Sequence, residues 1–477
     1  MSTPKILIEI PADCKSLAEP IQALITKVAS LVRTCRDGKA LDYQGIEDEL
    51  RDLAGSVERS AHESVLPSTM IDAPAIRIEG IVYVPVCRSK GRYMTQTGIV
   101  EFDRPLYREK GVRNGPTVDP IAVRIGAVRN GWLPGTSKVM AHLVQQGTSR
   151  EAAETSSQLG RLPYSRASFE RVPHEVGAAF IEQRADIEGE LIADFVVPSA
   201  ARSVSVSIDR VSIPMEEPRA RPRGRPTKDA PKNPISRQFR MAYCATVTLH
   251  DEDGQAVHSI RYGRMPQGDA DGLADALGSD VLALLRQRPD LEVVRLADGA
   301  HEMWRLLEAG IDDESLGKAA TSLIDFWHFV EKLSAAARML DGDPAQTTKR
   351  WRDELLENTH GASTILSELQ RHAANQYRTG DEDHDPVQAV ITYIENHKER
   401  MNYAQARKNG LPIGSGNVEA TCKSLVQVRM KRAGSRWKEQ SGDDIMQLRA
   451  LALSARWNDA MDNLFQRRRR DIRLQAA

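Results

Sequence analysis

The segment Ser203-Val-Ser-Val-Ser-Ile-Asp209 limits the fold of this chain more than any other stretch. Three apolar residues, Val204, Val206 and Ile208, alternate with serines, and this period of two is typical of a β-strand with one apolar face. Asp209 then projects from the other face, near the end of the strand. An aspartate in such a position is ordinarily a turn former, so it indicates function only if matching partners occur elsewhere.

Asp298 is the first candidate partner. It follows the apolar strand Leu291–Ala297, and the run His301–Glu308 after it has helical spacing. Open α/β sheets keep their ligand sites just outside the carboxyl ends of the strands. We therefore expect Asp298 to lie at a site rather than on a plain turn.

Glu419 is the second candidate partner, in the Gly-rich turn Gly414–Glu419 that opens a helix. Alone, it is ordinarily a helix-start glutamate, at the third position of a capping box with Gly416 as the cap, and it can also pair with Lys423. Together with Asp209 and Asp298 it makes three hard oxygen donors, which suit Mg²⁺ or Mn²⁺. The three acids predict a site for such cations, and two bound cations would act together on phosphate.

Residues 201–340 read as a strand, a basic linker, two strands, and then helices alternating with strands. Asp251-Glu-Asp-Gly254 marks a hairpin between the second and third strands. This order is that of the ribonuclease H-like fold, with a mixed sheet. A helical insertion follows at 341–410 and precedes the Glu419 helix; it is expected to pack, with no substrate-facing role assigned.

Composition sets the class of protein. The 477 residues suffice for about three domains, and the apolar and charged fractions of 41% and 27% are those of a soluble globular chain. No long apolar run predicts a membrane span, and the start lacks a secretion signal, so we expect a cytoplasmic, nucleoid-associated protein. The five scattered cysteines indicate neither disulfides nor a Cys-based zinc site.

The region before the core divides into three expected parts. Residues 1–70 form two helices that pack on their own chain or on a second copy, 71–115 form a small β element, and 116–200 are helical. In the last part, Gly147 ends one helix, Thr148 or Ser149 caps the next, and Ser165 opens a third, basic helix. This arrangement resembles a helix-turn-helix unit, although any three-helix domain shares it.

Basic segments surround the expected acidic site. Arg221, Arg223 and Arg225 belong to a basic arm at 216–238, whose Pro-Arg-Gly-Arg-Pro resembles an AT-hook for the minor groove of DNA. A solvated linker explains the arm equally well. A second patch follows Glu419, and we predict DNA contacts there from Lys423, Arg429, Lys431, Arg432, Arg436 and Trp437. The end of the chain, 456–477, is expected to be a basic, solvated tail.

Asp325 and His328 form one more constellation, three residues apart where a strand meets a helix. That spacing places both on one helical face, where His328 could touch a phosphate or a leaving group. A histidine packed beside Trp327 is the ordinary alternative.

Five segments carry a family resemblance: Ser207-Ile-Asp-Arg-Val-Ser-Ile-Pro214, Ala297-Asp-Gly-Ala300, Ile324-Asp-Phe-Trp-His328, Pro412-Ile-Gly-Ser-Gly-Asn-Val-Glu-Ala-Thr-Cys-Lys423 and Arg429-Met-Lys-Arg-Ala-Gly-Ser-Arg-Trp437. They are similar to the ISKra-type bacterial insertion-sequence transposases, part of the DDE group with a ribonuclease H-like core and related to Mutator-like enzymes. The resemblance covers residues 200–450 well and 70–180 more loosely. A cysteine-bearing segment survives only as Cys87, a departure from the family.

The resemblance implies a function for each motif. Asp209, Asp298 and Glu419 would be the catalytic, metal-binding triad, and Asp325 with His328 would match the Asp/Cys-x-x-His motif of the group. The chain would be a polynucleotidyl transferase that uses Mg²⁺ or Mn²⁺ to cut and join double-stranded DNA at element ends and target. It would act as a homo-oligomer, at least a dimer on DNA. Alternatives are a nuclease without strand transfer and a domesticated DNA-binding protein.

The expected architecture is thus multidomain, α+β and α/β. A small β element and a helix-turn-helix-like region precede a ribonuclease H-like core at 201–340, which the helical insertion at 341–410 separates from its last part at 411–455. The sequence does not identify the terminal repeats, the target, or the route of transposition.

Overall fold

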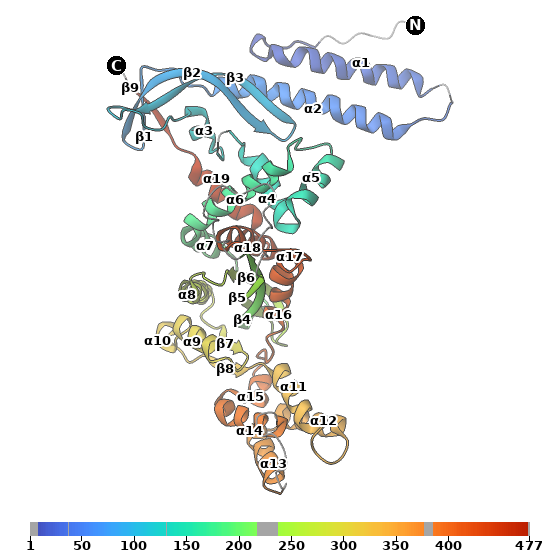
Figure 1. The fold of residues 1–477 in the computed structure, drawn as a ribbon, viewed down its shortest axis with the longest axis vertical. Coiled ribbons are helices and arrows are strands. Elements are labelled where there is room, and N and C mark those ends of the chain that lie inside the picture. The colour runs from blue at the N-terminus through green and yellow to red at the C-terminus, as the bar shows by residue number, and fades with distance from the viewer. Residues whose placement is uncertain (1–7, 37, 130, 217–236, 376–384, 476–477) are drawn as a thin grey trace, which may run out of the picture. The chain divides into compact units, whose positions relative to one another are not determined.

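The computed structural model describes residues 8–36, 38–129, 131–216, 237–375 and 385–475. The chain divides into two compact units, drawn in Figure 1. The first unit comprises the described parts of Met1–Gln183 and Asn458–Ala477, and the second comprises those of Arg184–Trp457. The fold is therefore multidomain and mixes helices with sheets.

Two antiparallel helices begin the first unit, as the apolar spacing predicts. The 3₁₀ turn η1 (Ala12–Leu17) leads into α1 (Ala18–Thr34), and α2 (Tyr43–Ser68) returns beside it, with an ion pair between Lys27 and Glu49. No residue of α1 is buried, and Ile25, Val28 and Val32 stay 43%, 41% and 50% exposed. α2 therefore covers the apolar stripe of α1 only in part, and packing on a second copy stays a prediction.

A four-stranded antiparallel sheet in the order β3-β2-β1-β9 follows. β1 (Ala75–Ile78), β2 (Ile81–Thr95) and β3 (Gly98–Glu109) form the expected β element. β9 (Ile472–Gln475) pairs with β1, with Ile76 opposite Leu474. The expected solvated tail is thus corrected: its residues form this strand and the helix α19 (Trp457–Arg468), because Ala460, Met461, Leu464 and Phe465 bury a helical stripe.

Helices complete the first unit, and they begin and end at the residues that the sequence indicates. They are α3 (Pro120–Ile125), α4 (Pro134–Gln146), α5 (Ser149–Gln158) and α6 (Arg166–Glu182). Gly147 ends α4, and Thr148 forms a capping box with Glu151 at the start of α5. Ser165 precedes α6, and α4, α5 and α6 pack on one another. A three-helix unit is present, as expected.

The second unit is built on a five-stranded sheet in the order β6-β5-β4-β7-β8. β4 (Ser203–Glu216), β5 (Arg237–His250) and β6 (Ala256–Arg264) are antiparallel neighbours. β7 (Glu292–Ala297) and β8 (Thr321–Ile324) extend the sheet in parallel with β4. The sheet is therefore mixed, and β4 is central.

Both faces of β4 are covered, which corrects the expectation of one apolar and one polar face. Val204, Val206 and Ile208 pack into a core with α8 (Ala270–Gln287) and α9 (His301–Gly310). The serines 203, 205 and 207 on the other side are also buried, at 0–2% exposure. Farther along, Val211, Ile213 and Met215 share a second core with the Glu419 helix and α18 (Glu439–Leu453). The alternation thus marks a central strand between two helical layers.

The remaining helices of the second unit lie before the insertion, within it and after it. α7 packs on α8, and the inserted helices bury Trp351, Leu355, Ile365 and Leu369 in continuity with the core of the sheet. These helices are α7 (Arg184–Ala193), α10 (Asp313–Leu316), α11 (Phe326–Ala337), α12 (Pro344–Glu357), α13 (Gly361–Asn375), α14 (Pro386–His397), η3 (Lys398–Arg400), α15 (Tyr403–Lys408), α16 (Gly416–Thr421), the π-helix η4 (Cys422–Gln427) and α17 (Val428–Met430). The packing expected of the insertion is present.

Candidate active site

Three aspartates follow one register across neighbouring parallel strands. Ser207 of β4 lies opposite Leu296 of β7, so two residues farther on Asp209 comes beside Asp298. Ala297 of β7 lies opposite Ile324 of β8, so the next positions are Asp298 and Asp325. The backbone N–H of Asp325 donates to the carbonyl of Ala297 at 2.9 Å, which continues the ladder. Asp298 and Asp325 therefore lie just past the carboxyl ends of β7 and β8, and Asp209 lies at the same level of β4. The expectation that Asp209 lies near the end of its strand is wrong, because β4 continues to Glu216. We call this level the carboxyl-end edge of the sheet.

Asp209 lies against the helix that carries Glu419. The Sγ of Cys422, one turn after Glu419, is 3.4 Å from Oδ2 of Asp209. Cys422 begins the π-helical turn η4, which follows α16 without a break. Such turns re-aim the side chains of a helix and are frequent at functional sites. Glu419 and Asp209 thus come from elements that touch, although 210 positions separate them in the sequence.

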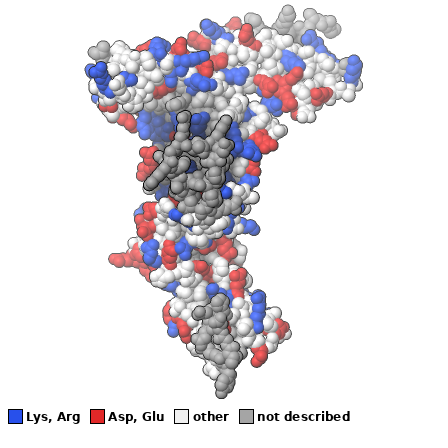
Figure 2. Space-filling model, viewed as in Figure 1, with Lys and Arg blue, Asp and Glu red and all other residues white. Residues whose placement is uncertain are grey.

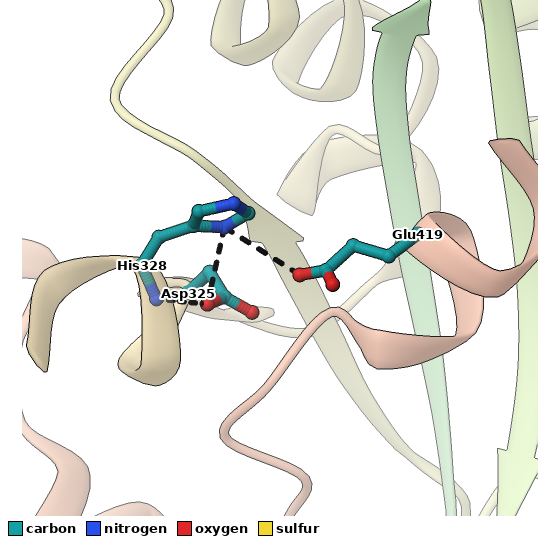
Figure 3. A group of neighbouring side chains, drawn as sticks. All are labelled: Asp325, His328 and Glu419. Atoms are coloured by element: carbon teal, nitrogen blue, oxygen red, sulfur yellow. Dashed lines mark hydrogen bonds and ion pairs between the residues drawn. The ribbon is translucent and has the colours of Figure 1, made fainter. Parts of the chain in front are cut away.

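Glu419 faces His328 and Asp325, as Figure 3 shows. Nδ1 of His328 is 3.6 Å from Oε1 of Glu419 and 3.3 Å from Oδ1 of Asp325. The Asp325 side chain is fully buried, whereas those of His328 and Glu419 are 40% and 48% exposed. His328 is therefore not the packed histidine of the ordinary alternative: it bridges two carboxylates at the surface of the site.

Asp325 is fixed by backbone donors on two elements. It caps α11, where Oδ1 accepts from the N–H of His328 at 2.7 Å, and Oδ2 accepts from the N–H of Ser415. The second bond ties the loop before α16 to the end of β8. Ser415 is the residue before α16, and its side chain caps nothing, so the capping box expected for Glu419 is not formed. Glu419 is free to point at His328 instead.

The three groups change one another's protonation. Hydrogen bonding to Asp325 raises the pKa of His328 to about 9, although burial opposes this, and Glu419 contributes in the same direction. Burial would raise the pKa of Asp325, but the bonds from His328 and Ser415 outweigh it and lower the pKa to about 2. Burial, together with the charges of Asp325 and Asp209, raises the pKa of Glu419 against the opposing effect of His328. A protonated His328 thus sits among carboxylates at neutral pH.

Of the predicted triad, Asp209 and Glu419 lie on elements that touch, whereas Asp298 is placed by the strand register and by its contact with the insertion. Across the described ranges, one group of three potential ligands has all its atoms within 4.8 Å, and it is Asp325, His328 and Glu419. Asp209 acts electrostatically on Glu419. Asp298 lies beside the insertion, because its charge raises the pKa of Tyr393 on α14, where burial is the larger cause. The insertion therefore borders the site as well as packing.

The predicted DNA-contacting residues fall into different environments. Arg221, Arg223 and Arg225 lie outside the described residues. Lys423, Lys431 and Arg432 are exposed, and Arg436 and Trp437 are half-buried. Arg429 is only 5% exposed and its guanidinium stacks over Trp437 at 5.1 Å. That pair closes the end of β4, where Trp437 exchanges backbone hydrogen bonds with Pro214 and Glu216, so it serves packing rather than an exposed contact.

Two neighbours of the site carry no local signal in the sequence. Glu302 of α9 forms an ion pair with Arg210 and accepts from the hydroxyl of Tyr243 at 2.5 Å, which holds the residue after Asp209. Tyr393 packs so closely on Gly299 that a Cβ there would lie 2.4 Å from its ring. Only the order of strands, not a motif, could have placed Glu302 near Asp209.

Comparisons with known proteins add little to this geometry. No protein-family model matches the chain, and no curated protein matches it. Among solved structures, the Drosophila P element transposase strand transfer complex is similar at 11% identity and a TM-score of 0.24, covering 71% of this chain and 81% of that chain. A score this low carries no argument about fold or function. Among the helices described, none has the length and apolarity needed to cross a membrane.

Proposed function

We propose that this chain is a metal-dependent DNA transposase of the DDE group, with a ribonuclease H-like core and Asp209, Asp298 and Glu419 as its catalytic triad. The proposal includes the similarity to ISKra-type transposases that the motifs around these residues carry. It also includes action on double-stranded DNA as a homo-oligomer.

One observation carries the proposal: the register that aligns Asp209 with Asp298 across β4 and β7, while the Glu419 helix packs against Asp209 through Cys422. The strand order β6-β5-β4-β7-β8, with three antiparallel strands and two parallel ones, supports the ribonuclease H-like assignment. Asp298 follows the carboxyl end of β7, where such sheets bind ligands, and Asp209 lies beside it in the adjacent strand β4.

The carboxylates of the triad fit a hard divalent cation such as Mg²⁺ or Mn²⁺. Asp209 Oδ1 accepts from its neighbour's N–H at 2.6 Å and Asp298 Oδ1 from that of Ala300 at 2.9 Å, which leaves lone pairs on both groups. Glu419 is about half exposed. Bound cations would supply charge neutralisation and an activated hydroxyl for attack on phosphate. A pair of cations does not require all three carboxylates to touch.

Asp325 and His328 fit a different role. The Asp325 side chain is fully buried and its two oxygens accept from the backbone N–H groups of His328 and Ser415, while Nδ1 of His328 lies between Asp325 and Glu419. We therefore assign them to positioning: Asp325 fixes His328, and His328 holds the Oε1 of Glu419 in place. In this proposal, Asp325 and His328 thus support Glu419 of the triad.

The test is strand cleavage and joining on a duplex made from the DNA that flanks this gene. Purified protein with Mg²⁺ or Mn²⁺ should nick the duplex and join a 3′-hydroxyl to a second DNA, and EDTA should stop both steps. Cleavage without joined product would instead establish a nuclease. DNA binding without either product, in the presence of both metals, would leave a non-catalytic binding protein and refute the proposal.

A further inference from the structure

Three adjoining cavities in the first unit form one groove between the β2–β3 hairpin and α6. The first cavity, about 490 Å³, has Arg92 and Arg171 on its walls, and the second, about 290 Å³, shares Arg171 with it. The third, about 560 Å³, shares Arg104 with the first and Arg129 with the second. We call this surface the cationic groove.

Charge sets the groove apart from the rest of the chain. Seven cations line it, against the carboxylates of Asp119 and Glu182, whereas the whole chain has 65 Lys and Arg and 66 Asp and Glu. The cations come from β2 and β3, the connection between α3 and α4, α6, and the end of α19 with the residues just after it. Figure 2 shows Lys and Arg side chains gathered over α3 and α19 in the same unit. Cations gathered on one surface of a chain of balanced charge attract a polyanionic partner.

Carboxylates neutralise only part of the groove. Arg104, Arg129 and Arg470 pair with Asp119, Glu175 and Glu79 at 2.6, 3.2 and 2.5 Å. Lys90 and Arg92 share one carboxylate, that of Glu101, at 2.7 and 2.9 Å. Arg171 is exposed, and its hydrogen bond within the described chain goes to the carbonyl of Ala167 in its own helix, at 3.3 Å. At least one charge on the sheet and one on α6 therefore face the same hollow uncompensated.

The aromatic residues of the groove are part of its floor. Trp132 is 9% exposed and packs edge-on against Tyr164, with ring centroids 4.6 Å apart. The hydroxyl of Tyr164 donates to the backbone carbonyls of Thr95 and Gly98. Rings held this way offer no open face on which unpaired bases could stack, as single-strand binders require. The groove thus offers charge without a stacking platform.

We infer that the cationic groove binds the phosphate backbone of double-stranded DNA, with the β2–β3 hairpin and α6 acting as one surface. Long cationic side chains on two facing elements contact phosphates independently of sequence. The proposed function gives the reason for duplex DNA; the groove then says where the first unit holds it. This differs from a helix-turn-helix unit acting alone, because the β2–β3 hairpin supplies three of the seven cations.

The test compares two variants of the full chain that lose the same charge. Arg92→Gln with Arg171→Gln removes two exposed groove cations, and Arg33→Gln with Arg77→Gln removes two exposed cations that line none of the three cavities. Binding of a labelled random-sequence duplex is followed by fluorescence anisotropy over a range of salt, without metal. The groove variant should bind roughly tenfold more weakly, with the slope of log K against log salt reduced by about 2.

The outcomes separate this inference from the proposed function, because random duplex binding requires neither metal nor catalysis. The control variant should bind like the wild type, and single-stranded RNA of equal length should bind more weakly than the duplex. Wild-type affinity in the groove variant, an equal loss in the control, or preference for RNA would each overturn the groove. Circular dichroism of both variants checks that neither has unfolded.

Discussion

The carboxyl-end edge of the β4–β7–β8 sheet and the cationic groove hold their charges in opposite ways. At the edge, Asp209, Asp298 and Asp325 are short side chains that accept from backbone N–H groups within three residues of themselves. In the groove, Lys90 and Arg92 are long side chains that stay 65% and 61% exposed. Little rotamer entropy remains to be lost at the edge, whereas ordering each groove cation is costly. The edge therefore suits chemistry that requires fixed atoms, and the groove suits binding that tolerates a variable ligand.

The largest effect on DNA cleavage should follow from changing one side chain at the carboxyl-end edge of the sheet. Asp298→Asn keeps the size of the side chain but removes the negative charge that a divalent cation requires. We expect DNA cleavage to fall by about a thousandfold, with duplex binding unchanged within about twofold. Single-turnover cleavage with Mg²⁺ measures this. Asp271→Asn, an exposed aspartate paired with Arg305, is the control and should cleave normally; cleavage by Asp298→Asn at that level would refute the triad.

Salt concentration should affect DNA binding by the groove far more than DNA cleavage at the edge. If about three phosphates are contacted in the groove, raising salt from about 50 to about 200 mM should weaken duplex binding by roughly 40-fold. The cleavage rate of DNA already bound should stay within about twofold, because cleavage depends on fixed local groups. Anisotropy and single-turnover rates at saturating protein measure the two quantities. A parallel fall in both would show that the regions are not separate in function.

His328 should have an intermediate effect. His328→Gln removes the cation that holds Glu419 and Asp325, and we expect the cleavage rate to fall by about tenfold while all three triad carboxylates remain. His360→Gln, at the exposed end of the α12–α13 connection, is the matched control. A loss as large as that of Asp298→Asn would show that His328 acts on the substrate directly, contrary to the positioning role.

The smallest effect concerns stability. The pKa of His328 is raised to about 9 in the folded protein, above its unfolded value, so its contribution is complete below about pH 6.5 and is lost as the pH rises through 9. Because the side chain is 40% exposed, we expect about 1 kcal/mol after solvent screening. Urea unfolding with EDTA measures the free energy of unfolding at pH 6 and pH 9.5. Wild type should be more stable than His328→Gln at pH 6, and this difference should disappear at pH 9.5. A stability difference that grows with pH would have the opposite sign and would refute the raised pKa of His328.

Much of the core was predictable because its signals are local. Alternation in Ser203–Ile208, the turn at Gly254 and the helix start at Ser165 each depend on a few neighbouring residues, and the structure has the elements they indicate. The position of Asp298 after a strand was predictable for the same reason. Which strand lies beside β4 was suggested only by the order of elements.

Long-range packing was not predictable from these patterns. Nothing near His328 indicates that Glu419, 91 residues later, turns toward it, because that contact depends on how the insertion returns the chain to the sheet. Burial of Ser203, Ser205 and Ser207 likewise depends on distant segments, since they pair with β5 and β7 and Ser205 Oγ lies 2.8 Å from Nε2 of His250. The charge of the last residues concealed the apolar spacing of Met461, Leu464 and Phe465, which was present and would have predicted α19.

The pairing of β9 with β1 has a consequence for biosynthesis. The ribosome makes β1 nearly 400 residues before the strand that completes its sheet, and the whole second unit emerges in between. Until release, β1 keeps a bare edge of unpaired amides and carbonyls. Premature termination anywhere after residue 110 would therefore leave a product with this edge open, and such products should aggregate or be degraded even when their own helices have formed.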